Sequence, residues 1–315
     1  MVSEYSNQDI ERSQTIFSGN FFSYDETPFV VLGVPLDMTG TYRAGTEGGP
    51  LAIRKASEDT ETYSWRCNFD FMRIGACDLG DLKIVPGALE KTLDRLKVTV
   101  SDLVSEGKIP ILLGGEHTIT VGAARALTDS KTGLVVFDAH MDLRDSYRNI
   151  KLGDATCMRR IVELVGSSNL VEVGVRAISD QELRFADASG IAYITSEEIV
   201  KGDLSAIVSE IKEALRGFHK IYISLDFDVL DPSFAPGVGN PEPEGISVRN
   251  LLDLLSKIVD HRVLGFDLSE VNPLFDPSFI TARAASHVIY EVCSLLHTSI
   301  RPENRAGNPT SLLSK

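Results

Sequence analysis

Four short apolar runs along the chain each stop abruptly at glycine, acidic or histidine residues. Successive positions within each run are apolar, so both faces of the segment would be buried. Runs of this kind, bounded by glycine or charge, are typical of parallel strands that helices cover on both faces. The four runs cover residues 109–113, 134–137, 221–225 and 263–266.

Over the whole chain, the same hydrophobic pattern predicts eight strands separated mostly by amphipathic helices. The strands lie near 28–34, 72–78, 109–113, 133–138, 169–175, 190–194, 220–226 and 262–268. The clearest helical patterns cover 88–106, 196–216, 247–260 and 277–297. Because a helix between two strands of one sheet acts as a crossover, it makes those strands parallel. We therefore expect a doubly wound α/β fold.

The chain of 315 residues shows no break in composition and no internal repeat between residues 28 and 298. This length fits one large α/β domain or two smaller ones, and the unbroken pattern favours one. We expect a single domain over residues 1–315, with residues 1–27 as an N-terminal arm and 301–315 as a polar tail. Such ends are commonly frayed, and some arms reach a neighbouring subunit.

The net charge of −14 argues against a nucleic-acid-binding surface, which needs a basic face. The charge is compatible with a small cationic substrate. No apolar run approaches the ~20 residues of a membrane span, and the N-terminus carries no signal-like segment. The cysteines, which show no metal or redox spacing, are Cys67, Cys77, Cys157 and Cys293. We therefore expect a reduced, cytoplasmic setting.

Acidic and imidazole side chains follow the four apolar runs, where the carboxyl ends of parallel strands form the ligand crevice of an open α/β sheet. Four carboxylates in one crevice would repel one another unless positive charge lay among them. Two divalent cations would balance that charge, and oxygen-rich ligation with imidazole and no thiolate favours Mn²⁺ or a similarly hard ion. Residues 138–142 alternate as Asp-Xaa-His-Xaa-Asp, and alternate residues of an extended segment point the same way. The six candidate ligands are His117, Asp138, His140, Asp142, Asp226 and Asp228.

The motifs that carry these residues resemble those of the ureohydrolase family of arginases, agmatinases and formimidoylglutamases. The resemblance covers most of the chain. It includes Gly33-Val34-Pro35-Leu36-Asp37, Tyr42-Arg43-Ala44-Gly45, Gly49-Pro50-Leu51-Ala52-Ile53-Arg54, all the candidate ligand motifs, and the runs 224–232 and 235–243. It implies an α/β/α sandwich around an eight-stranded, mainly parallel sheet. It also implies a binuclear manganese hydrolase, with two Mn²⁺ per chain, that releases urea from a guanidinium group.

The resemblance gives each candidate ligand an expected role. The bridging ligands would be Asp138 and Asp226, with His117 and Asp142 completing one metal site and His140 and Asp228 the other. Two bridged metals lower the pKa of a shared water and so supply hydroxide at neutral pH. Asp142 would also receive the hydroxide proton and pass it to the leaving amine.

Two further acidic residues are candidates for the active site. Glu270 follows the last predicted strand and matches the family's guanidinium-binding glutamate. A carboxylate suits that role, since it can accept two parallel N–H bonds from a planar guanidinium. Where many relatives carry a proton-shuttling histidine in a Ser-His-Ala context, this chain has Gly153-Asp154-Ala155. Three roles stay open for Asp154: replacing that histidine, binding a distal cation of the substrate, or capping the helix that follows.

The identity of the substrate depends on the loop of residues 143–153. This loop lacks the Ser-Gly-Asn run that arginases use around the amino-acid head group, which favours agmatine, hydrolysed to putrescine and urea. Asp145 and Asp154 could meet a substrate ammonium group. The basic residues that could instead pair with a carboxylate are Arg144, Arg148 and Lys151. Arginine, guanidinobutyrate and guanidinopropionate therefore stay open as substrates, as does a metal-binding subunit without turnover.

Residues 231–245 are rich in proline and glycine. Proline restricts the backbone, so this segment predicts a rigid wall beside the candidate ligands. The family's trimers and hexamers further imply a homo-oligomer.

Overall fold

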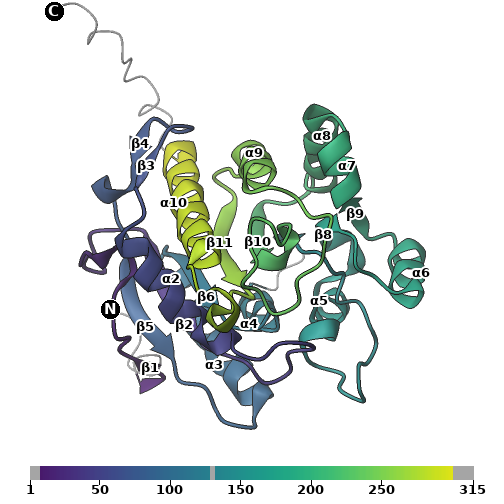
Figure 1. Cartoon of the computed structure of the whole chain (residues 1–315), viewed down its shortest axis with the longest axis horizontal. Helices are drawn as coiled ribbons and strands as arrows, with labels where there is room; N and C mark the ends of the chain where they lie inside the picture. The colour runs from purple at the N-terminus through teal and green to yellow at the C-terminus, as the bar shows by residue number, and fades with distance from the viewer. Residues whose placement is uncertain (1–7, 128–131, 301–315) are drawn as a thin grey trace, which may run out of the picture.

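The computed structural model describes residues 8–127 and 132–300, and a nine-stranded sheet forms the centre of this part of the chain (Figure 1). In spatial order the strands are β1 (Ile10–Glu11), β5 (Cys77–Leu82), β2 (Phe29–Val34), β6 (Ile109–Gly114), β11 (Val263–Ser269), β10 (Lys220–Asp226), β7 (Thr132–Phe137), β8 (Leu170–Val175) and β9 (Ala192–Thr195). All neighbours pair in parallel except β1, which pairs antiparallel with β5. The predicted α/β fold with a mainly parallel sheet is confirmed, and the short β1 is added to the eight predicted strands.

Helices cover both faces of the sheet and produce three layers (Figure 1). One face carries α2 (Gly49–Glu58), α7 (Ser196–Lys201), α8 (Leu204–Ala214), α9 (Val248–Ile258) and α10 (Ile280–Ile300). The other carries α3 (Leu89–Ser105), α4 (Ile119–Ala126), α5 (Cys157–Val165) and α6 (Asp180–Ser189). Side chains of β7 alternate between the two apolar layers, with Val135 and Phe137 in one and Leu134 and Val136 in the other. This alternation explains why the strand reads as apolar at every position.

The strand predicted near 72–78 begins later, as β5. Residues just before it form the 3-10 turn η3 (Phe71–Arg73), with Phe71 fully buried. Asp70 accepts a hydrogen bond from the backbone N–H of Met72 and so starts this turn. The apolar residues that suggested a strand are therefore buried by a turn, after a short hairpin of β3 (Tyr63–Ser64) and β4 (Phe69–Asp70).

The helix predicted over 196–216 is two helices, α7 and α8. Gly202 ends α7 with extended backbone angles, and the Asp203 side chain accepts a hydrogen bond from Ser205 N–H at the start of α8. The hydrophobic pattern does not single out four shorter helices, which are α2, α4, α5 and α6.

A buried ion-pair network, the Arg54 cluster, ties α2 to the edge of the sheet. The Arg54 side chain is fully buried, with Nε 2.8 Å from Asp78 Oδ2 and Nη1 2.6 Å from Asp81 Oδ1. Its Nη2 donates to Asp78 Oδ1 and to the carbonyl of Gly80. One cation and two carboxylates of the chain itself thus satisfy one another.

Residues at the beginning of the described chain pack on the sheet edge. Ile10 and Glu11 form β1, and Phe17 is buried against the core. The predicted tail of residues 301–315 lies outside the described residues. Among the helices of the described chain, none has both the length and the apolar character that crossing a membrane requires.

Candidate metal centre

The six candidate ligands lie at the carboxyl ends of three strands, β6, β10 and β7, and Glu270 follows β11, which lies between β6 and β10. His117 follows β6, and the segment 138–142 follows β7. Asp226 is the last residue of β10, and Asp228 lies in the 3-10 turn η6 (Phe227–Val229) directly after it. The parallel register thus brings together residues more than one hundred positions apart, as the sequence predicts.

The first cluster surrounds His117, whose side chain is fully buried. Its Nδ1 lies 3.1 Å from Asp138 Oδ2, 3.3 Å from Asp226 Oδ2 and 3.4 Å from Asp142 Oδ2. Within the described chain, this nitrogen makes no hydrogen bond of acceptable geometry. Three carboxylate oxygens and one buried, unpartnered nitrogen therefore converge on one point, as ligands of an ion do.

The other ring nitrogen of His117 is hydrogen-bonded on the side away from the cluster. Its Nε2 lies 2.9 Å from Ser224 Oγ, and Ser224 donates its hydroxyl proton to Asp267 Oδ1 at 2.7 Å. Ser224 therefore accepts from Nε2–H, which leaves the lone pair of Nδ1 directed into the cluster. Ser224 and Asp267 lie on predicted strands beside the ligands, but no motif in the sequence marks them as partners of His117.

The second cluster surrounds His140. Its Nδ1 lies 3.1 Å from Asp228 Oδ2 and 3.4 Å from Asp138 Oδ1. Its Nε2 lies 3.0 Å from Asn240 Nδ2 and 3.7 Å from Glu242 Oε1, both in the proline-rich segment 231–245. Asp138 therefore contacts both imidazoles, one with each carboxylate oxygen.

The charges of the two clusters are unbalanced. Burial, followed by the proximity of Asp228 and Asp138, raises the pKa of Asp226 well above its ordinary value. Burial and the charge of Asp138 likewise raise the pKa of Asp142 to about 6. Burial opposes a charged His117, yet the surrounding carboxylates raise the pKa of its imidazole well above the usual range. Asp142 and Asp226 thus hold a proton more readily than free carboxyls do, because they are buried where positive charge is scarce. Asp138 differs, since the two imidazoles lower its pKa although burial opposes this.

Glu270 is placed by unusual backbone geometry. Its φ of 69° and the φ of 49° at Asp142 both lie in the left-handed region, which is rare for residues with a side chain. Glu270 Oε1 accepts the backbone N–H of His117 at 2.9 Å. A Cβ at Gly239 would lie 2.1 Å from Glu270 Oε2, so only glycine leaves room for this carboxylate. Burial, followed by the charge of Asp154, raises the pKa of Glu270 well above its ordinary value.

A cavity of about 100 Å³ lies over both clusters. It is lined by His140, Asp142, Asp154, Asp226, Asp228 and Glu270, with Arg144, Tyr147 and Asn240 among the remaining wall residues. A neighbouring cavity of about 120 Å³ shares Thr41, Tyr147, Asp154 and Ala155 with it. Most of the candidate site residues therefore face one shared space.

Asp154 lies where the two cavities meet, and it does not cap the helix that follows. It is the first residue of the 3-10 turn η4 (Asp154–Thr156), whose N-cap is Gly153, and Thr156 precedes α5. The backbone N–H of Asp154 donates to Thr39 Oγ1 at 3.0 Å. Burial and the charge of Asp142 raise the pKa of its carboxyl well above the ordinary value. The capping role is thus wrong, and the other two roles stay open.

The charged residues of the loop 143–153 are divided between the cavity and the surface. Arg144 reaches the cavity, with Nη2 3.3 Å from Glu182 Oε2, and lies over the ring of Tyr147. Asp145 is exposed and lies 3.4 Å from Arg160 Nη2. The side chains of Arg148 and Lys151 are exposed as well.

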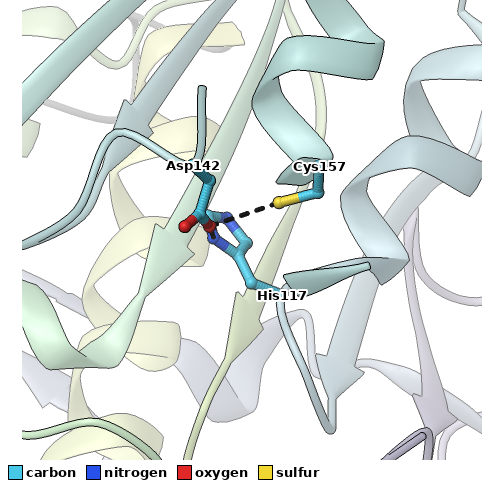
Figure 2. A group of neighbouring side chains, drawn as sticks. All are labelled: His117, Asp142 and Cys157. Carbon is cyan, nitrogen blue, oxygen red and sulfur yellow. Dashed lines mark hydrogen bonds and ion pairs between the residues drawn. The ribbon is translucent and has the colours of Figure 1, made fainter. Parts of the chain in front are cut away.

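Two further residues beside the site have no signal in the sequence spacing. Cys157, at the start of α5, donates from Sγ to Asp142 Oδ2 at 3.3 Å (Figure 2). Arg176 follows β8 and donates only to backbone carbonyls. These belong to Gly174, Asp228, Val229, Leu230, Glu242 and Pro243. Arg176 therefore fixes the backbone of one candidate ligand and of the segment that contacts His140.

The fold and the site together define a class of protein. A mainly parallel α/β/α sandwich carries two imidazoles and four carboxylates at the carboxyl ends of its central strands, beside a cavity. Two groups of these residues have ligand atoms close enough to hold a metal ion, and a third group adds Cys157 to His117 and Asp142. The chain therefore belongs to the α/β proteins that have a candidate divalent-cation site at the carboxyl ends of their strands.

Comparison with known proteins identifies the family. The model of the arginase family matches residues 27–294. The chain is 33% identical over 290 residues to the agmatinase of Bacillus anthracis, covering 89% of this chain and 98% of that protein. It is 35% identical over 263 residues to the N(1)-aminopropylagmatine ureohydrolase of Thermococcus kodakarensis, covering 82% and 88%. The crystal structure of agmatine ureohydrolase of Thermoplasma volcanium superimposes with a TM-score of 0.85 at 33% identity, covering 94% and 98%. The chain therefore belongs to the arginase family, and it is an agmatinase-like ureohydrolase, as its motifs predict.

Proposed function

We propose that this chain is a binuclear manganese hydrolase that cleaves agmatine to putrescine and urea. The observation that carries the proposal is the position of Glu270, whose carboxylate lines the same cavity as the two clusters that share Asp138. A guanidinium held by Glu270 would lie beside both clusters. The names of the relatives from Bacillus anthracis and Thermococcus kodakarensis support a guanidino amine as the substrate.

The side chains of the two clusters fit a pair of divalent cations. The buried, unpartnered Nδ1 of His117 and the contact of Asp138 with both imidazoles support one ion in each cluster, with Asp138 between them. In the proposed assignment Asp138 and Asp226 bridge, His117 and Asp142 complete one site, and His140 and Asp228 complete the other. When bound, two Mn²⁺ ions would lower the pKa of a water between them and so supply the nucleophile.

The residues of the chain orient the substrate and move its protons. Glu270 accepts N–H bonds from the guanidinium, which fixes the orientation of the planar group over the clusters. Asp142 would take the proton that the nucleophile loses and pass it to the departing amine.

We assign Asp154 to the distal ammonium group of the substrate. Its carboxylate lines the cavity that holds Glu270 and also the adjoining cavity, and no ion pair joins it to a cationic side chain of the described residues. Neighbouring acids raise its pKa, and a substrate cation would relieve that repulsion. An amine at one end and a guanidinium at the other would thus meet one carboxylate each.

The second candidate is a guanidino acid, such as guanidinobutyrate, guanidinopropionate or arginine. The observation that favours it is the position of Arg144 on the cavity wall. This guanidinium is already paired with Glu182 and lies over Tyr147, which weakens its attraction for a substrate carboxylate.

Urea release from a panel of guanidino compounds with added Mn²⁺ tests the proposal. We expect kcat/KM to be highest for agmatine, or for its aminopropyl derivative, and lower for arginine and the guanidino acids. If a compound with a carboxylate has the highest kcat/KM, the agmatine assignment is wrong although the ureohydrolase activity stands. Bound Mn²⁺ without urea release from any compound would favour the metal-binding subunit without turnover.

The role of Asp154 is tested by Asp154→Asn with Asp145→Asn as its matched control. Asp145 lies in the same loop region but is exposed beside Arg160. We expect the Asp154 variant to lose kcat/KM for agmatine while guanidinobutyrate, which has no ammonium group, changes much less, and the Asp145 variant to keep the native order of substrates. An equal loss for all substrates would instead favour proton delivery, because that step is common to all of them.

Two further proposals concern assembly and compartment. We propose that the chain is a homo-oligomer, a trimer or hexamer, which rests on the family resemblance. We propose that it acts in the cytoplasm, which rests on the absence of metal or redox spacing among its cysteines. Light scattering of the purified protein tests the assembly, and a monomer at micromolar concentration would contradict it.

A further inference from the structure

Cys157 brings a thiol into contact with the His117 cluster. Its side chain is fully buried at the first turn of α5, and Figure 2 shows Sγ directed toward Asp142 and His117. Sγ lies 3.3 Å from Asp142 Oδ2, and that same oxygen lies 3.4 Å from His117 Nδ1. All three ligand atoms lie within 4.8 Å of one another.

A second observation points to a ligand at this position. His117 Nδ1 is fully buried and makes no acceptable hydrogen bond within the described chain, while Ser224 holds the opposite ring nitrogen and directs the lone pair toward the group. Metal–nitrogen and metal–oxygen bonds of about 2.0–2.2 Å and a metal–sulfur bond of about 2.3 Å are compatible with donors this close together. The donors comprise one nitrogen, one oxygen and one sulfur, a combination that zinc sites use.

We propose that Cys157 is a conditional metal ligand, and that Zn²⁺ or Co²⁺ binds in the His117 cluster through His117, Asp142 and the Cys157 sulfur. The inference rests on the proposed metal centre and adds a ligand to it. As the sulfur–metal bond forms, the thiol proton leaves for solvent and the sulfur donates its electron pair. With Mn²⁺, a harder ion, the thiol keeps its proton and continues to donate to Asp142.

The consequence is that the two metal positions differ in selectivity. The His140 cluster offers only nitrogen and oxygen donors, from His140, Asp138 and Asp228. The His117 cluster adds sulfur, so thiophilic ions should prefer it over the His140 cluster. The identity of the ion in the His117 cluster would then depend on which divalent ions compete for it.

Titration of the chelated full-length protein with Co²⁺ tests the inference without an activity assay. We expect a near-ultraviolet sulfur-to-cobalt charge-transfer band that grows as the first equivalent binds. Zinc-edge X-ray absorption of the Zn²⁺-loaded protein should show a sulfur neighbour at about 2.3 Å. Both measurements use the unaltered chain, so they do not depend on a variant that folds.

Three variants separate ligation from hydrogen bonding. Cys157→Ser keeps a donor to Asp142 but removes the soft ligand, and Cys157→Ala removes both. Cys293→Ala is the matched control, because Cys293 is a buried thiol on α10 outside the clusters. The band should vanish in both Cys157 variants and persist in the control. Cys157→Ser should weaken Zn²⁺ binding by at least the ~10-fold that loss of an outer partner costs, and Mn²⁺ binding by less.

Two results would overturn the inference, and they can be told apart. If the unaltered protein binds Co²⁺ with visible absorption but shows no charge-transfer band, Cys157 is only a hydrogen-bond donor and the proposed metal centre stands. If neither Co²⁺ nor Mn²⁺ binds at stoichiometric concentrations, the proposed metal centre is wrong together with the Cys157 assignment.

Discussion

The Arg54 cluster and the candidate metal centre both bury aspartates at the sheet, yet their charges are balanced in different ways. In the Arg54 cluster the chain supplies the cation, and the guanidinium donates to both carboxylates, Asp78 and Asp81. In the metal centre, four carboxylates meet two imidazoles, and burial followed by the neighbouring carboxylates raises the pKa values of Asp142 and Asp226.

This difference distinguishes buried charges that stabilise the fold from buried charges that form a binding site. A buried carboxylate with a cation of its own stabilises the fold whether or not anything binds. Buried carboxylates without one cost stability until an external cation arrives, so their arrangement indicates a binding site.

Removal of divalent ions should abolish turnover completely and leave the Arg54 cluster intact. We expect chelated protein to be inactive, and Mn²⁺ to restore urea release with close to two ions per chain, because two divalent ions balance four carboxylates. Metal analysis of the restored protein and far-ultraviolet circular dichroism of the chelated protein are the measurements. One tightly bound Zn²⁺ in the active form would contradict a binuclear manganese centre.

Asp226→Asn should lower turnover by about 100-fold or more and weaken Mn²⁺ binding, since loss of an outer-shell partner alone costs ~10–100-fold. Its counterpart Asp78→Asn should keep the ion content but lower the free energy of unfolding by about 3 kcal/mol, at the low end for a broken buried pair because Asp81 remains. Calorimetric metal titration and urea denaturation separate the two outcomes. Native activity and ion content in Asp226→Asn would show that the ligand assignment is wrong.

Glu270→Gln should lose most of kcat/KM while keeping both ions. Removing one partner of a desolvated, charged hydrogen bond costs ~2–5 kcal/mol, and the neutral amide cannot match the guanidinium charge. Steady-state kinetics with agmatine and metal analysis of the same sample are the measurements. If the variant keeps native kcat/KM, the guanidinium is held elsewhere in the cavity.

Mn²⁺ affinity should fall as the pH drops below about 6. Burial and Asp138 raise the pKa of Asp142 to about 6 in the ion-free site, and the ion binds only the deprotonated carboxylate. Below that pH the apparent Kd should rise about tenfold more per pH unit because of this one proton. Above it the Kd should continue to fall more gently, because the pKa values of Asp226 and His117 are also raised and the ion must displace their protons. Paramagnetic resonance of free Mn²⁺ between pH 5 and 8 measures this slope, which Asp142→Asn should reduce.

Much of the fold and of the candidate site follows from local sequence signals. Strands β6, β7, β10 and β11 contain apolar runs that stop at glycine or acidic residues, so both their position and the convergence of their ends could be predicted. The pattern fails where a local turn takes the place of the start of a strand, as at Met72, and where a cap divides a helix, as at Asp203. The contacts of Cys157 and Arg176 depend on how separate segments pack, and no spacing within the chain encodes them.

Arg176, which donates to six backbone carbonyls, restricts sequence change in one wall of the cavity more than in the other. The wall formed by residues 231–245 is bound to the backbone of Asp228, so a change there would shift a candidate ligand. The other wall, residues 143–153, has largely exposed side chains, and one of them, Asp145, pairs with Arg160 on α5. New substrate preferences can therefore arise by exchange of this second wall alone, and directed evolution of the enzyme should begin with it.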